Sequence, residues 1–122
     1  MSDKKPGDLS DAPEVPLPNM AGRIARDHPE VWKAFQRLGE ATGDAGPLDD
    51  RAKRLVNLAL AIGADSEGAT HSHVRRALAE GLSREELEHV AYLAITTLGW
   101  PRAARGLAWI RDVTEARRAR ER

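Results

Sequence analysis

Apolar residues recur at helical spacing along most of the chain, and no stretch of useful length alternates apolar and polar residues as a strand would. Pro29, at a first-turn position, opens a predicted helix that ends near Gly43. Asp49 or Asp50 can cap the next helix, whose apolar run continues almost unbroken to Ile62. A helix that is apolar around most of its circumference is usually central to a fold. The pattern therefore predicts an all-α protein.

Caps and glycine stops mark the remaining helices. Asp65 or Ser66 can cap a helix that stops at Gly81. Ser83 and Glu86 then form the S-x-x-E pattern of a capping box at the head of the following helix. The other predicted helices are a short one over residues 20–27 and a last one that restarts at Pro101. The sequence thus predicts a bundle of about five to six helices.

The chain divides into a tail and one predicted domain. Residues 1–20 carry four prolines among charged and small residues, a composition that buries too little apolar area to offset ordering. We expect a disordered or strap-like tail there, and a partner-binding arm is the alternative. The remaining residues, 21–122, are enough for a single helical domain with a core of its own.

Core composition points to self-association. Many predicted core positions are alanine and aromatic residues make up only 4% of the chain, so each residue buries modest area. A nearly continuous apolar helix in so small a chain suggests further burial against other subunits. We therefore expect a homo-oligomer.

Composition also excludes several classes of protein. Nineteen basic residues balance nineteen acidic ones, which argues against a dedicated nucleic-acid binder. The basic run ARRARER at the C-terminus fits a solvated helix end better than a site for an anionic partner. Without cysteine there is no disulfide, thiolate nucleophile or cysteine metal site. No apolar run approaches the roughly 18 residues of a membrane span, and no apolar leader follows the first residues, so we expect a cytoplasmic protein.

A metal site would need several of the four histidines to converge. His71 and His73 point about 200° apart around one helix and cannot bind the same ion. Glu67 and His71 share a face, but such a pair forms a surface ion pair as readily as half a metal site. Only His89 or another subunit would complete it. We predict no metal and no cofactor.

His73 is the best candidate for chemistry because it lies on the apolar stripe of its predicted helix. It is either a core histidine hydrogen-bonded within the fold or a general acid or base whose neutral form is favoured by partial burial. Arg76, one turn further on, and Arg54, on the preceding long helix, are candidates for holding an anionic substrate. His89 would approach His73 if the two helices pack antiparallel, as the short connection between them suggests.

Four residues at fixed spacing form a pattern that is similar to one found in a known protein family. The pattern is H-x-x-x-A-x-x-x-G-x-x-x-x-E, and its members are His73, Ala77, Gly81 and Glu86. This spacing resembles the carboxymuconolactone decarboxylase family, which includes the alkylhydroperoxidase D-like proteins. Residues 48–63 are similar to the central helix of that family, and T-L-G-W-P at residues 97–101 looks like its helix break. The resemblance covers roughly residues 30–112.

The resemblance implies an alkylhydroperoxidase D-like helical bundle that assembles into trimers or hexamers without metal or organic cofactor. The peroxidase branch of the family uses C-x-x-C-x-x-x-H, and its two cysteines would fall at Ser66 and Ala69. One family glutamate would fall near Arg54, and another common one is His89 here. Thiol-based peroxide reduction is therefore excluded, because serine and alanine cannot form a disulfide. Only His73 matches the active-site pattern of the family.

Two hypotheses follow. The first is a cofactor-free, carboxy-lyase-like enzyme that decarboxylates or isomerises a small carboxylate or lactone. In the decarboxylase reaction that the resemblance implies, His73 would protonate an extended enolate while Arg54 or Arg76 holds a carboxylate. The second is a catalytically silent oligomeric helical module that binds a small molecule or a protein. Both stay open at the level of sequence.

Overall fold

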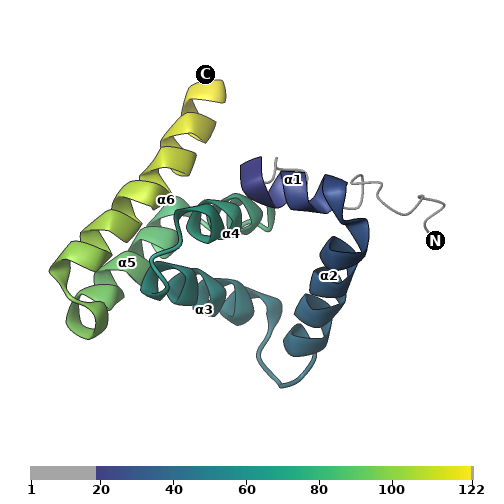
Figure 1. Ribbon diagram of the computed structural model, residues 1–122. Coiled ribbons are helices and arrows are strands. Elements are labelled where there is room, and N and C mark those ends of the chain that lie inside the picture. The colour runs from purple at the N-terminus through teal and green to yellow at the C-terminus, as the bar shows by residue number, and fades with distance from the viewer. Residues whose placement is uncertain (1–18, 122) are drawn as a thin grey trace. The chain divides into compact units, whose positions relative to one another are not determined.

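The computed structural model describes residues 19–121, and its secondary structure is all α-helical, as the sequence predicts. No strand occurs in that part of the chain. The predicted tail falls almost entirely outside the described residues. Six helices follow one another: α1 (Asn19–Asp27), α2 (Pro29–Gly43), α3 (Asp50–Gly63), α4 (Glu67–Ala79), α5 (Arg84–Leu98) and α6 (Trp100–Arg120) (Figure 1).

The chain divides into two compact units, the first ending at Leu48 and the second beginning at Asp49. In the first, α1 packs against α2, which begins at Pro29 as predicted. The rings of Trp32 and Phe35 lie 5.8 Å apart on α2 in a tilted arrangement.

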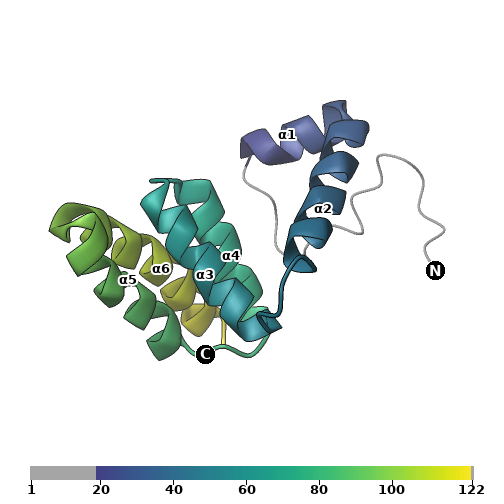
Figure 2. The same ribbon diagram turned by 90° about the horizontal axis from the view of Figure 1, so that it is seen from below.

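The second unit is a four-helix bundle of α3, α4, α5 and α6 (Figure 2). The closest pairs are α5 with α6, α3 with α4, and α4 with α6, so α6 lies against two neighbours along its length. All four helices contribute to one hydrophobic core. Its buried members are Leu58, Ile62, Val74, Ala77, Leu82, Leu87, Ala91, Ile110 and Val113.

The predicted caps form at three helix starts. The side chain of Asp49 accepts a hydrogen bond from the backbone N–H of Ala52 at 2.8 Å. Ser66, the second of the two predicted candidates, caps α4. Ser83 and Glu86 form the complete capping box at α5, with bonds of 3.1 and 2.9 Å. These caps satisfy backbone donors that have no partner within the helix.

Glycine is required where helices end or approach closely. Gly81 and Gly99 adopt φ of 95° and 93° after α4 and α5, a region that other residues rarely enter. Gly106 allows α6 to approach α3, because a Cβ at that position would meet the side chain of Ile62 at 2.8 Å.

The long apolar helix α3 has two different faces. Leu58 and Ile62 are fully buried in the bundle, in agreement with the predicted central role of this helix. Val56 and Leu60 are 45% and 63% exposed in the single chain. Among the described residues, no helix is both long and apolar enough to cross a membrane.

Candidate functional site

Arg54 and His73 meet between the packed helices α3 and α4. Nη1 of Arg54 lies 2.7 Å from Nδ1 of His73. The other side of the same guanidinium faces Glu80, with Nε 2.9 Å from Oε1 and Nη2 2.7 Å from Oε2. This bidentate pair leaves the Arg54 side chain only 15% exposed. One arginine therefore joins a carboxylate and an imidazole in a single hydrogen-bonded cluster.

The Arg54 contact selects one form of the His73 ring. A guanidinium has donors and no acceptor, so Nδ1 of His73 must accept the hydrogen bond. In the neutral imidazole the proton then lies on Nε2, which is a donor. His73 thus presents an N–H group, and its basic nitrogen is already occupied by Arg54.

Burial and charge keep His73 neutral. The pKa of His73 is lowered from 6.5 to about 4, chiefly by desolvation of the half-buried ring and also by the positive charges of Arg54 and Arg76. The carboxylate of Glu80 acts in the opposite direction and is outweighed. At neutral pH the ring is an uncharged hydrogen-bond donor.

Arg76 is the second cation beside this ring. Its Nε is shielded from solvent and has no hydrogen-bond partner among the described residues. Burial lowers its pKa, and the nearby Arg54 lowers it further. A buried arginine donor without an acceptor is costly, and an anion beside Arg76 would supply that acceptor.

Two other residues singled out by the sequence lie apart from this cluster. His89 is exposed on α5, and within residues 19–121 no hydrogen bond or ion pair joins it to His73. The helices α4 and α5 were expected to pack against each other, but α5 packs chiefly against α6 and α3 and makes little contact with α4. Glu86, part of the four-residue pattern, caps α5 and pairs with Arg51.

Glu80 belongs to the cluster but was not among the residues predicted from the sequence. The signal was present in its spacing: residues at i, i+3 and i+7 share one face of a helix, which places Glu80 on the same side of α4 as His73 and Arg76. Its carboxylate occupies Arg54 and changes the role expected for that arginine.

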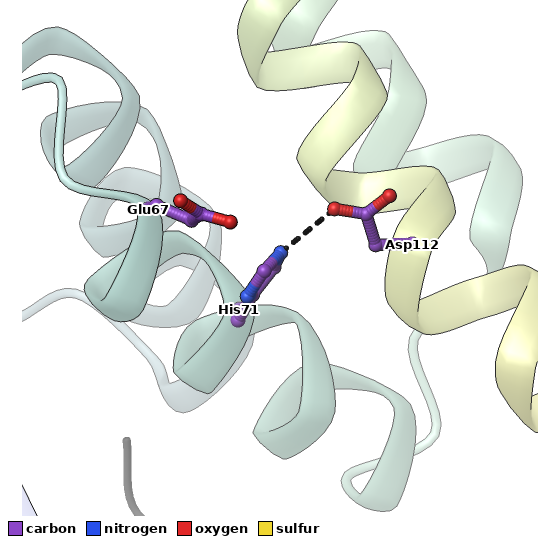
Figure 3. A group of neighbouring side chains, drawn as sticks. All are labelled: Glu67, His71 and Asp112. Atoms are coloured by element: carbon purple, nitrogen blue, oxygen red, sulfur yellow. Dashed lines mark hydrogen bonds and ion pairs between the residues drawn. The ribbon is translucent and has the colours of Figure 1, made fainter. Parts of the chain in front are cut away.

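A second polar cluster lies on the other side of α4 (Figure 3). Glu67 and His71 come from α4 and Asp112 from α6, and one ligand atom of each lies within 4.8 Å of the others. This arrangement differs from the expectation that His89 or another subunit would complete a site here, because α6 supplies the third donor.

A cavity of about 530 Å³ lies elsewhere in the bundle, between the end of α4, the start of α5 and the end of α6. Leu78, Leu82 and Thr114 are among the residues that line it, and neither Arg54 nor His73 borders it. The hollow and the His73 cluster are therefore separate features.

The family model described as carboxymuconolactone decarboxylase family matches residues 29–112, which is more than half of the chain. The chain belongs to the carboxymuconolactone decarboxylase family. The matched range includes Arg54, His73 and Arg76. A curated relative from Haemophilus influenzae, an uncharacterized protein, is 29% identical over 56 residues. That alignment covers 46% of this chain and 50% of the relative, so the chain spans about half the length of the curated relative it matches.

This member of the carboxymuconolactone decarboxylase family has no cysteine and hence no redox thiol. Ser66, where the resemblance places the first cysteine, uses its hydroxyl to cap α4 by accepting from the backbone N–H of Ala69 at 3.1 Å. That position has a structural role in this chain.

Proposed function

We propose that this carboxymuconolactone decarboxylase-like protein is a cofactor-free enzyme that decarboxylates or isomerises a small carboxylate or lactone, with His73 at the reacting centre. The observation that carries the proposal is the hydrogen bond from Arg54 to Nδ1 of His73. It leaves a neutral imidazole with its N–H free for substrate.

A neutral imidazole can donate its N–H to an oxygen atom on which negative charge develops during the reaction. When a carboxylate leaves as carbon dioxide, its bonding electrons enter the rest of the substrate and form an extended enolate. An N–H donor aimed at the enolate oxygen stabilises that charge in the transition state. A proton from solvent then completes the product, while Arg54 holds the neutral ring of His73 in place.

Arg54 and Arg76 take different roles in this proposal. The sequence suggested both as substrate-binding residues, but Arg54 already bonds Glu80 and His73. Arg54 is therefore a positioning residue, and Arg76, with its buried unpaired Nε, is the candidate partner for the substrate carboxylate. His89 has no assigned role in the cluster and stays a sequence prediction.

The test is turnover of a panel of small carboxylated lactones by the wild-type chain and by His73→Gln and Arg76→Gln. We expect His73→Gln to lower kcat by roughly 100-fold or more, in the range of general acid–base and oxyanion contributions. Arg76→Gln is expected chiefly to raise KM. A folded His73→Gln variant that turns over an identified substrate as fast as the wild type would refute the proposal.

Self-association is part of the same proposal. The exposed side of α3 carries Val56 and Leu60, and burying large apolar side chains against another subunit removes them from water. A homo-oligomer, a trimer or hexamer by family resemblance, is expected to use this face. Light scattering after size exclusion should show a smaller assembly for Leu60→Glu than for the wild type. The cytoplasmic location stays a sequence prediction.

The alternative is a catalytically silent oligomeric module. The Arg54–Glu80 pair favours it, because a guanidinium fixed by a carboxylate is equally suited to hold two helices together. This alternative predicts binding of a small carboxylate without turnover, and the same affinity in the wild type and in a folded His73→Gln variant.

A further inference from the structure

Glu67, His71 and Asp112 bring three donor side chains to one surface point between α4 and α6 (Figure 3). Glu67 and His71 are four residues apart, so they share a face of α4. Asp112 projects from α6, 41 residues further along the chain than His71. Since α4 and α6 pack against each other in the bundle core, the donors come from two rigid elements.

The spacing of the donors suits a small cation. Nε2 of His71 lies 3.0 Å from Oδ2 of Asp112. Two metal bonds of about 2.0–2.1 Å at a tetrahedral angle would place such a nitrogen and oxygen about 3.3 Å apart. The ligand atom of Glu67 lies within 4.8 Å of the other two, a gap that rotation of its flexible side chain can close.

The charge of these side chains and their access to solvent also favour binding of a cation. Within residues 19–121 the carboxylate of Glu67 makes no hydrogen bond or ion pair, although it stands beside another carboxylate. The side chain of Asp112 is 56% exposed, whereas that of His71 is 19% exposed. An ion can therefore reach the site from solvent, and a divalent charge would offset the two neighbouring carboxylates.

We propose that Glu67, His71 and Asp112 form a site for one divalent transition-metal ion of the zinc class. One imidazole nitrogen with two carboxylate oxygens suits Zn²⁺ or Co²⁺ better than Mg²⁺, which prefers oxygen ligands alone and retains its water. Three protein ligands leave a fourth position for water. This site does not depend on the chemistry proposed for His73.

The test is titration of the untagged, full-length wild-type chain with ZnCl₂ by calorimetry, repeated with CoCl₂ by visible absorption. We expect one ion per chain, a tetrahedral Co²⁺ spectrum, and a rise in Tm with Zn²⁺ because the ion bridges two helices of the folded state. Glu67→Gln, His71→Gln and Asp112→Asn should each weaken Zn²⁺ binding about tenfold or more, since even residues that only orient ligands contribute that much.

His89→Gln is the matched control, because it removes an exposed histidine of α5 outside the cluster. It should bind Zn²⁺ as the wild type does, and so should His73→Gln. Absence of saturable Zn²⁺ binding up to about 1 mM, a range that corresponds to weak affinity, would overturn the proposal. Equal Zn²⁺ binding by the wild type and the three ligand variants would also overturn the proposal. In either case the contact between His71 and Asp112 would be an ion pair only. Each variant must first show the same circular dichroism spectrum as the wild type, so that loss of binding is not loss of folding.

Discussion

Arg54 donates a hydrogen bond to Nδ1 of His73 over 2.7 Å while its remaining nitrogens hold Glu80. The glutamate fixes the guanidinium, and the guanidinium fixes the imidazole. This chain of contacts determines which ring nitrogen of His73 carries a proton and keeps the ring uncharged at neutral pH.

Replacing Arg54 by glutamine is expected to raise the pKa of His73 from its value of about 4. The change removes a nearby positive charge and releases the carboxylate of Glu80, which favours the charged ring. An NMR titration of the imidazole C–H signals measures this pKa. An unchanged pKa in the folded variant would show that Arg54 has no electrostatic effect on the ring.

The depressed pKa of His73 makes the fold sensitive to acid. Between pH 6.5 and about 4 the unfolded chain binds a proton at this ring and the folded chain does not, so stability falls as the pH falls. The loss should be about 1–2 kcal/mol, less than the full shift implies because water still screens a partly exposed ring. Urea unfolding at several pH values measures it.

A His73→Gln variant separates this effect from the titration of carboxylates, which both proteins share. Its stability should decline less steeply than that of the wild type from pH 6.5 to about 4. Parallel profiles for the two proteins would contradict the depressed pKa.

Gly106→Ala tests the close packing of α3 and α6. The new Cβ would meet buried Ile62 at 2.8 Å, and overpacking of this kind should exceed the gain in helix propensity. We expect a net loss of about 1–2 kcal/mol in the free energy of unfolding. Gly63→Ala is the matched control, because its Cβ would meet Leu98 at an ordinary 3.7 Å. Equal stability of the two variants would contradict the close approach.

Ser83→Ala removes one half of the capping box at α5. The backbone N–H of Glu86 loses its acceptor, which should cost about 1 kcal/mol of stability. Ser72 lies inside α4 and its hydroxyl makes no hydrogen bond among the described residues, so Ser72→Ala should have little effect. Thermal unfolding compares the two, and a Ser83→Ala variant with wild-type stability would count against the cap.

The helices were predictable because their limits are set locally. Pro29 at a first turn, side-chain caps such as Asp49, and glycines such as Gly81 act through neighbouring backbone groups, so the sequence contains the necessary information. The proximity of Gly106 and Ile62 could not be foreseen, because it depends on how two helices cross.

The candidate site was only partly predictable. The spacing and the family resemblance identified His73 and suggested Arg54 and Arg76, but not that Arg54 would bond both His73 and Glu80. The same limit applied to Glu67 and His71, whose third partner, Asp112, arrives from a distant helix. Contacts between helices depend on packing, which a helical pattern leaves open.

The protonation of His73 at neutral pH is the most direct test of this account, and long-range ¹H–¹⁵N correlation of the labelled imidazole measures it. The contact with Arg54 predicts an unprotonated Nδ1 and a protonated Nε2. A proton on Nδ1, or on both nitrogens, would contradict the hydrogen bond from Arg54 and with it the role proposed for His73.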